Sequence, residues 1–322
     1  MPSNSAETPA AIPATEQGHP WRGYFFIATA TLCWGAAATA GKAVFNGALF
    51  AGRASISPVV LSQARTSFAV LLLAVFLVLR YGRTFFRIPG RDLVLCVLVG
   101  VLGLTGSNYF YYLAIQHATV AIAITLQYTA PVWVLLWTSL RGHQAATLRR
   151  AGAVALALAG IALTIGLFQS GFRLNLLGTV AALLASFSFA LYNIAGQQLV
   201  SRHHPFRIMF FVLLGSAVFW LIVNPPWRLA AQHYSTGQWG FLFVFACLST
   251  LLPYFFFFSG LKYLDPTRAV IASCLEPVFA VLFAAVFVGE GVRALQVTGI
   301  VAVLAATVMA QAGGTRPLPE AD

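Results

Sequence analysis

The hydrophobic positions of this chain gather in long blocks that short polar connections separate. Ten blocks of mostly apolar residues follow a polar segment at the start of the chain, and each is close to the roughly 20 residues that cross a bilayer as a helix. The connections are short and carry Gly, Pro, His or Arg, so neighbouring helices are expected to be antiparallel. The predicted spans are residues 22–44, 58–79, 92–115, 118–140, 148–168, 174–199, 206–224, 239–261, 266–288 and 294–312. The pattern predicts an all-α integral membrane protein with ten transmembrane helices.

Composition agrees with this fold class. Of 322 residues, 59% are hydrophobic and 8% are charged, against about a quarter charged in soluble domains, and the mean hydropathy is +0.83. A net charge of +11 would suggest a nucleic-acid partner in a soluble protein. Here the basic residues lie in short loops between apolar spans, where they report topology and contact anionic lipid. The expected partner is therefore the lipid bilayer and not nucleic acid.

The arginines and lysines also predict an orientation. With the N-terminus inside, thirteen of them lie on the inner side, and the outer side keeps Arg53, Arg173, Arg228 and Arg293. This bias places both termini in the cytoplasm and the chain in the bacterial inner membrane as a multi-pass protein. Residues 1–21, rich in Pro, Ala, Ser and Thr, are expected to be a disordered cytoplasmic tail and not a signal peptide. Residues 313–322 form a second cytoplasmic tail.

The two halves of the chain repeat one pattern. When Pro131 is aligned with Pro277, residues 108–132 overlay 254–278 and keep an aromatic-rich helix, a short turn and the proline in register. A second overlay places Trp34 on Phe189 and Lys42 on Gln197. The predicted units are residues 22–168 and 174–312. Because five helices per unit is an odd number, the second unit is inserted upside down, and such inverted repeats are typical of transporters that work by alternating access.

At these residues the chain resembles the EamA-type family of the drug/metabolite transporter superfamily, over about residues 22–312. The features that carry the resemblance are Trp34-Gly35, Pro58 with Arg65, the proline-centred segments TLQYTAPV and ASCLEPVFAVLF, and Gly289-Glu290. The chain departs from the family pattern where His143 follows Gly142 and where Phe189-Ala190 replaces a Trp-Ala pair. The resemblance implies an exporter of amino acids or other small metabolites, with a central cavity between the repeats.

Glu276 is the leading candidate for function. Of the eight acidic residues, it is the only one predicted inside the apolar part of a helix, where a charge is costly and marks function by default. It lies roughly 13 Å from the predicted cytoplasmic end of its helix, and Gln127 lies about as far from the outer end of the partner helix. One interpretation is that Glu276 loads and releases a proton as water access alternates. The other is that it stays protonated, or hydrogen-bonds backbone freed by Pro277, and only shapes the helix.

Further polar and aromatic residues lie amid apolar neighbours. Together with Glu276 they are expected to line a cavity for a small zwitterion or aromatic metabolite, and the predicted substrate-binding set is Trp34, Lys42, Asn108, Tyr112, Gln127, Tyr192, Asn193, Tyr254 and Glu276. Lys42 would attract a substrate carboxylate. For each polar residue the alternative role is hydrogen bonding between helices. Arg65 is interpreted as snorkelling to the interface, and the phenylalanines at 255–258 as a lipid-facing and packing surface and not a binding site.

The predicted function is a secondary active transporter that exports a small metabolite such as an amino acid, with protons as the candidate coupling ion. A facilitative uniporter or an importer is the alternative within the same class. A membrane-embedded enzyme is disfavoured because all six histidines lie in the tail or loops, and neither an H-E-x-x-H nor a Walker motif is present. No repeated filter motif points to a channel. The four cysteines lack metal-ligand spacing, so no metal or cofactor is expected, and the protein is expected to be a monomer or a homodimer.

Overall fold

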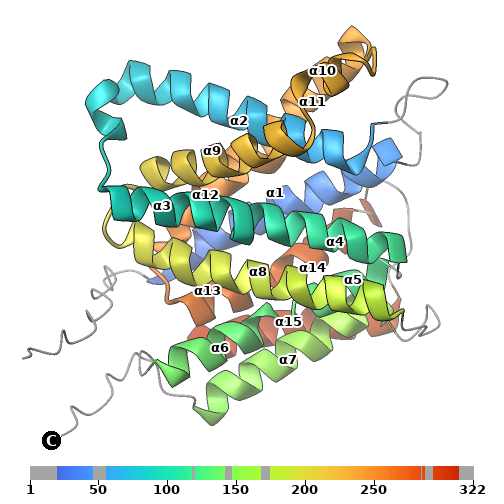
Figure 1. Cartoon of the computed structure of the whole chain (residues 1–322). Coiled ribbons are helices and arrows are strands. Elements are labelled where there is room, and N and C mark those ends of the chain that lie inside the picture. Colours follow the sequence, from blue (N-terminus) through green and yellow to red (C-terminus); the bar gives the residue numbers. More distant parts are fainter. Residues whose placement is uncertain are drawn as a thin grey trace, which may run out of the picture.

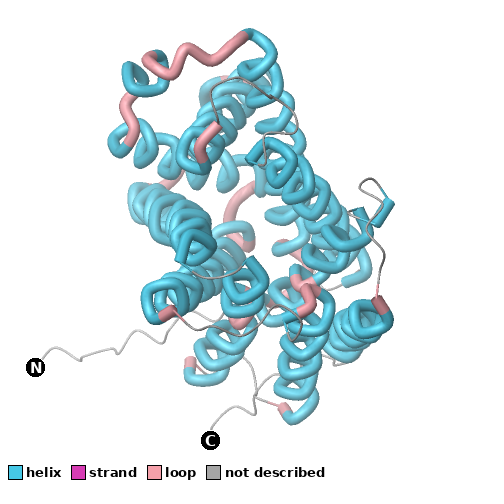
Figure 2. Tube along the Cα trace, turned by 90° about the vertical axis from the view of Figure 1, so that its right-hand side faces the viewer, coloured by secondary structure: helices cyan, strands magenta, loops and turns pink. Residues whose placement is uncertain are grey.

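The computed structural model describes residues 20–45, 56–117, 120–141, 147–167, 175–283, 285–286 and 293–311. The predicted tails lie outside these ranges except for residues 20 and 21. The described backbone forms helices and contains no strand, and short loops join the helices (Figures 1 and 2). The fold class is therefore all-helical, as predicted.

The first half of the chain begins with the longest helix of the protein and ends before residue 168. Its elements are α1 (Pro20–Phe45), α2 (Pro58–Tyr81), the 3₁₀ turn η1 (Arg83–Phe86), α3 (Gly90–Leu98), the π-helix η2 (Val99–Thr105), α4 (Gly106–His117), α5 (Val120–Gln127), α6 (Ala130–Leu140) and α7 (Leu148–Thr164).

The second half runs from Leu176 to Gln311. Its elements are α8 (Leu176–Val200), α9 (Pro205–Val223), α10 (Pro226–Ala230), α11 (Thr236–Ala246), the π-helix η4 (Cys247–Leu251), α12 (Leu252–Leu261), α13 (Pro266–Ser273), α14 (Leu275–Phe283) and α15 (Ala294–Gln311). Several helices begin with a proline after a capping residue, as α2 does after Ser57, α9 after His204 and α13 after Asp265. Proline suits this position because its missing N–H would have no helical partner there.

Six of the described helices are long and apolar enough to cross a membrane. They are Val59–Tyr81, Gly90–Tyr111, Leu176–Val200, Pro205–Val223, Thr236–Leu261 and Pro266–Phe283. Ala294–Ala310 is apolar but shorter. The described backbone within the ten predicted spans is helical almost throughout. Six spanning helices are thus supported by length and composition, and the count of ten stays a prediction.

The two halves pack on one another in a reciprocal way. In one direction, α1 contacts α12, α13 and α14; in the other, α8 contacts η2, α4, α5 and α6. Likewise α2 contacts α11 and η4, while α9 contacts α3 and η2. The remaining large contacts join α2 to α9 and α7 to α15. Much of the core therefore lies between the halves and not within each half.

Interruptions of the helices also fall at matching places. With Pro131 placed on Pro277, the π-helix η2 falls over η4, and the turn at Tyr128 and Thr129 falls over the turn at Cys274. π-Helical turns inside α-helices are frequently found at functional sites. The two halves are thus interrupted in the same register.

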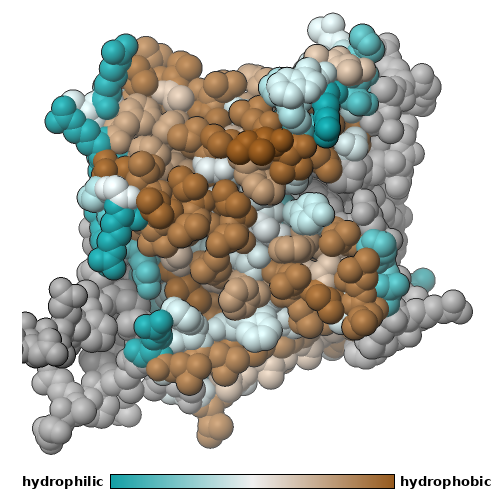
Figure 3. All heavy atoms as spheres, viewed as in Figure 1, coloured by the Kyte–Doolittle hydropathy of each residue, from teal (hydrophilic) through white to brown (hydrophobic). Residues whose placement is uncertain are grey.

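Surface polarity follows the direction of the helices. On the face shown in Figure 3, brown hydrophobic side chains cover the middle, and the teal hydrophilic ones gather toward the two edges at which the helices end. At the predicted inner edge, Asp92 pairs with His203 at 2.6 Å and with Arg202 at 3.7 Å. Asp265 pairs there with Arg268 at 3.2 Å. Charges at the edges and an apolar band between them are what a bilayer requires.

Candidate functional site

Glu276 lies at a break in a helix. The chain turns at Cys274, Glu276 stands in the first turn of α14, and Pro277 follows it. Because proline has no N–H and clashes with a preceding carbonyl, it favours a break at this place over a continuous helix. The break sets the carboxylate among side chains of other helices and not within an unbroken apolar stripe.

The matching break in the first half supplies the partner of this carboxylate. Tyr128, in the turn between α5 and α6, donates a hydrogen bond from its hydroxyl to Glu276 Oε2 at 2.6 Å. This oxygen–oxygen distance lies within the range of charge-assisted hydrogen bonds. Tyr128 is 5% exposed, so the bond is shielded from bulk solvent, and the two broken helices meet at this one hydrogen bond.

A cation lies close to the same carboxylate. Arg65, on α2, interacts electrostatically with Glu276, and its side chain lies near the hydroxyl of Tyr254. Asn108, on α4, reaches the same hydroxyl. The interpretation of Arg65 as a snorkelling side chain is therefore wrong. Its guanidinium turns toward the interior because Glu276 and Tyr254 offer it partners that lipid cannot.

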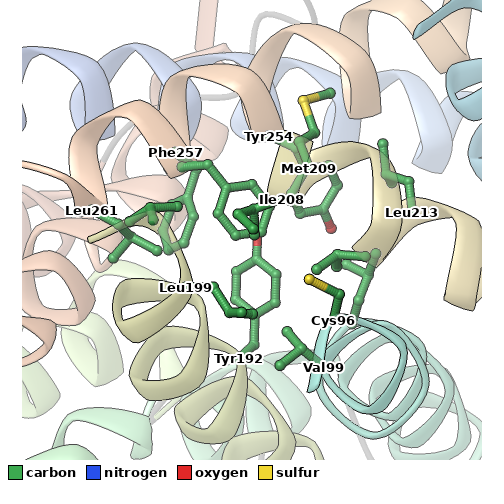
Figure 4. Packing of buried hydrophobic residues seen from close by; sticks show 14 of the residues in the cluster. Cys96, Val99, Tyr192, Leu199, Ile208, Met209, Leu213, Tyr254, Phe257 and Leu261 are labelled. Carbon is green, nitrogen blue, oxygen red and sulfur yellow. The ribbon is translucent and has the colours of Figure 1, made fainter. Parts of the chain in front are cut away.

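Aromatic rings surround these polar groups. The ring of Trp34, on α1, lies 5.3 Å from that of Tyr254 and 5.4 Å from that of Phe257. Tyr192, on α8, lies 6.1 Å from Tyr254 and 5.3 Å from Phe257. Figure 4 shows Tyr192 projecting from its helix toward Phe257 and Tyr254 of α12. Three helices from both halves thus contribute to one aromatic cluster.

The phenylalanine run at 255–258, expected to be a lipid-facing and packing surface, contains buried and partly exposed members. Phe257 and Phe258 are fully buried, whereas Phe255 and Phe256 are partly exposed. Phe257 and Phe258 belong to the packing surface, because the cluster around Tyr192 covers them.

The other polar candidates are held by neighbouring groups. Gln127 Nε2 donates to Ser107 Oγ at 3.0 Å, which joins α5 to α4. Asn193 Nδ2 donates to the carbonyl of Phe189 within its own helix at 2.8 Å. The Gln127 bond is of the kind between helices that was the alternative to substrate binding, whereas the Asn193 bond joins two residues of one helix.

The structure brings five of the predicted residues into one connected group, namely Trp34, Asn108, Tyr192, Tyr254 and Glu276. The side chains of Lys42 and Tyr112 lie outside the described part of the chain. Sequence reasoning missed Tyr128 and Arg65 as members. Two features of the sequence could have pointed to them: Tyr128 lies three residues before Pro131, and Arg65 follows Pro58 at the spacing that is part of the family resemblance.

Several buried donors in this group have no hydrogen-bond partner among the described residues: Trp34 Nε1, Arg65 Nε and the Tyr192 hydroxyl. Leaving such a group unpaired costs about 1–3 kcal/mol, so each calls for an explanation. Within the described ranges, no group of three or more His, Cys, Asp or Glu side chains could hold a metal ion. The arrangement offers one carboxylate, one guanidinium and several hydroxyl and indole donors, which suits binding of a small polar molecule.

Comparison with solved structures supports the fold. A crystal structure of another protein matches with a TM-score of 0.72, covering 90% of this chain and 97% of its own at 17% identity. At this identity the match shows the fold alone.

Sequence comparison finds named relatives. The threonine/homoserine exporter RhtA of Escherichia coli K12 is 32% identical over 212 residues, which are 64% of this chain and 68% of the relative. RhtA of Salmonella typhimurium LT2 is 31% identical over 208 residues, with the same two shares. An uncharacterized transporter of Archaeoglobus fulgidus is 28% identical over 215 residues, covering 65% of this chain and 75% of its own.

A family match covers most of the sequence. The EamA-like transporter family matches twice, at residues 21–166 and 176–311. The two matched ranges correspond to the two halves whose helices contact one another reciprocally. This chain belongs to the EamA-like transporter family.

Proposed function

We propose that this chain is a secondary active transporter that exports a small amino acid across the bacterial inner membrane in exchange for protons. The observation that carries the proposal is Glu276, an intramembrane carboxylate at the meeting point of two broken helices in an EamA-like chain. The relatives named as threonine/homoserine exporters support a small hydroxy amino acid as the substrate. Transport, and not catalysis, is the proposed activity.

The proposed architecture is ten spans in two inverted five-helix units, residues 22–168 and 174–312. The reciprocal packing of the halves supports it, since α1 on α12 to α14 has its counterpart in α8 on α4 to α6. The matched breaks and π-helices support it as well. In such a design the two halves exchange conformations, and the central site opens in turn to each side. Both termini are proposed to be cytoplasmic.

Proton exchange is proposed to take place at Glu276. The titratable and charged groups around it are Tyr128, Arg65, Tyr254 and Cys274. Glu276 is less completely buried than Tyr128, and Arg65 and Asn108 likewise keep part of their surface accessible, which supports access by water. A carboxylate that holds either a proton or a substrate ammonium group couples the two by exchange.

Efflux from proteoliposomes tests this function. Vesicles loaded with radiolabelled L-threonine or L-homoserine are diluted into buffer at the internal pH or at a lower pH. We expect efflux above that of protein-free vesicles, and faster efflux into the acidic buffer because protons then enter down their gradient. Efflux that ignores the gradient would favour a facilitative uniporter. Absence of efflux of either amino acid would refute the proposed substrate class.

A further inference from the structure

Arg65 gives the site a fixed positive charge that proton exchange at Glu276 does not require. An arginine guanidinium presents five N–H donors in a rigid fork that matches a carboxylate. A cation inside the membrane-spanning part of a protein is costly, and such residues mark substrate pathways or paired charges. Since Glu276 would alternate between charged and neutral forms during exchange, it cannot be the constant partner of Arg65.

Unpaired donors gather beside this cation. Arg65 Nε, Trp34 Nε1 and the Tyr192 hydroxyl are buried without a hydrogen-bond partner among the described residues. All three residues neighbour Tyr254: Trp34 and Tyr192 lie 5.3 and 6.1 Å away between ring centres, and Arg65 reaches the Tyr254 hydroxyl. They come from α1, α2 and α8. A carboxylate accepts only, with about four lone-pair sites, so one such group can satisfy several of these donors.

The opposite charge lies close to the same tyrosine. Glu276 interacts electrostatically with both Tyr254 and Arg65, so a group that can bind a carboxylate and a group that can bind an ammonium ion lie near one another. An α-amino acid carries its ammonium group and its carboxylate on the same carbon atom, so the two charges are only a few ångströms apart. The arrangement thus matches a small zwitterion better than a neutral solute or a simple anion, because both charges then find partners in surroundings of low dielectric.

We propose that Arg65 binds the carboxylate of a zwitterionic α-amino acid while ionised Glu276 binds its ammonium group, an inference that rests on the proposed export function. Lys42, the earlier candidate for the carboxylate, has a side chain outside the described residues. In this arrangement a proton that binds Glu276 displaces only the ammonium group of the substrate. Arg65 keeps its contact with the carboxylate and so selects for amino acids throughout the transport cycle.

Ligand binding to the purified protein in nanodiscs tests the assignment. Competition against radiolabelled L-threonine compares unlabelled L-threonine with L-threonine amide, which keeps the ammonium group and side chain but lacks the carboxylate. We expect the wild type to prefer threonine by about 30-fold or more, because removing one partner of a buried charge pair costs roughly 2–5 kcal/mol. In Arg65→Gln the preference should fall to near one. Arg65→Lys should keep part of it, since the charge remains without the fork.

A matched control lies on the same helix. Arg80 is exposed in the last turn of α2 and stacks on the ring of Tyr81, so Arg80→Gln removes an identical charge from the same element and should leave the preference unchanged. Equal binding of threonine and its amide by the wild type would overturn the inference. An Arg65→Gln variant that weakens both ligands equally would overturn it too, because Arg65 would then only position Glu276.

The outcomes separate this inference from the proposed function. Wild-type efflux in proteoliposomes tests export without reference to Arg65. If the wild type exports threonine and Arg65→Gln exports it equally well, only the role of Arg65 is refuted. If Arg65→Gln does not insert, the wild-type comparison of threonine with its amide still decides whether a carboxylate site exists, and Arg65→Lys decides whether the fork contributes.

Discussion

The interrupted helices α5–α6 and α13–α14 share their break and differ in the side chains beside it. Both carry a proline shortly after the break, Pro131 and Pro277, and α6 packs against α13. At overlaid positions the first half has Tyr128 where the second has Cys274. Two residues further on, the first half has Ala130 where the second has Glu276. One half therefore supplies the hydroxyl, the other supplies the carboxylate, and they meet in one hydrogen bond of 2.6 Å.

The shared breaks and the unequal side chains have different roles. The matched breaks give each half the same points at which the backbone can bend, which a transporter built from mirrored units would use for alternating access. A second carboxylate at Ala130 would add the cost of another intramembrane charge. We infer that the repeated backbone serves the movement and that the unequal side chains serve the chemistry.

The largest effect is expected from removing the carboxylate. Glu276→Gln keeps shape and hydrogen-bonding capacity beside Pro277 but cannot titrate. It should abolish the response of efflux to a pH gradient while the protein still folds and inserts. Glu276→Asp should keep partial activity with a shifted pH optimum, because the charge is retained at a shorter reach. Proteoliposome efflux under an imposed gradient measures both.

A purely structural role of Glu276 predicts a different result. If it only shapes the helix, the Gln variant should behave like the wild type, and only Ala or Leu should be damaging. Full gradient-driven efflux by Glu276→Gln would show that Glu276 is not the coupling residue. The two breaks would then differ only in how their side chains pack.

The sequence predicted where the helices lie better than it predicted which side of each helix is buried. Block length and the proline overlay located the helices within a few residues, since an apolar run of about 20 residues has one stable form in a bilayer. Glu276 was recognisable as the only carboxylate within an apolar span. Arg65 was misjudged, and the buried phenylalanines of the run at 255–258 were not told apart from the exposed ones, because a helix that is apolar all round gives no pattern that distinguishes its lipid face from its buried face.

Tyr128 was missed for a related reason. A tyrosine in an apolar helix suits the membrane interface, the packed core and a binding site alike. Only the meeting of α6 with α13 shows that its hydroxyl reaches a residue 148 positions away. Contacts between halves depend on how the helices cross, and neither hydropathy nor spacing specifies that.

The next effect in size concerns the hydroxyl of Tyr128. Tyr128→Phe removes the donor to Glu276, and a hydrogen bond to a charged group contributes about 1.5–3 kcal/mol, so the efflux rate should fall by about tenfold or more. Cys274→Ser at the overlaid position is the matched control, because Cys274 makes only a long contact of 3.5 Å to the Val270 carbonyl. Equal losses in the two variants would mean that the breaks matter and the hydroxyl does not.

A smaller effect should distinguish Gly299 from Gly152, which the repeat overlays once one inserted residue is allowed after the aligned prolines. A Cβ at Gly299 would lie 2.5 Å from the backbone nitrogen of Thr164, so α15 cannot keep its approach to α7. At Gly152 the nearest atom is the flexible end of Met309, at 3.0 Å. Gly299→Ala should cost about 1–3 kcal/mol by overpacking. Gly152→Ala should be close to neutral in thermal unfolding. A neutral Gly299→Ala would show that this contact yields more easily than the structure indicates.

The smallest effect concerns the residues that cap α2 and α9, two helices that contact one another and begin alike. Ser57 precedes Pro58 and His204 precedes Pro205, and each side chain accepts a hydrogen bond from a backbone N–H of its helix. Only His204 titrates. Burial and the nearby cations Lys262 and Arg207 lower the pKa of His204 below its ordinary value of 6.5. Between the two values the unfolded chain binds more protons than the folded one, so stability rises with pH there and the full contribution is present above about 6.5.

His204→Ser copies the cap of α2 and removes this dependence. Near pH 7.5 the variant should unfold within about 0.5 kcal/mol of the wild type, since serine also caps well. On acidification to pH 5 the wild type should lose more of its apparent Tm than the variant, because its imidazole gains a proton and can no longer accept the hydrogen bond. Parallel pH profiles of Tm for the two proteins would show that the cap of α9 holds without His204, and that the two helix starts are equivalent in practice.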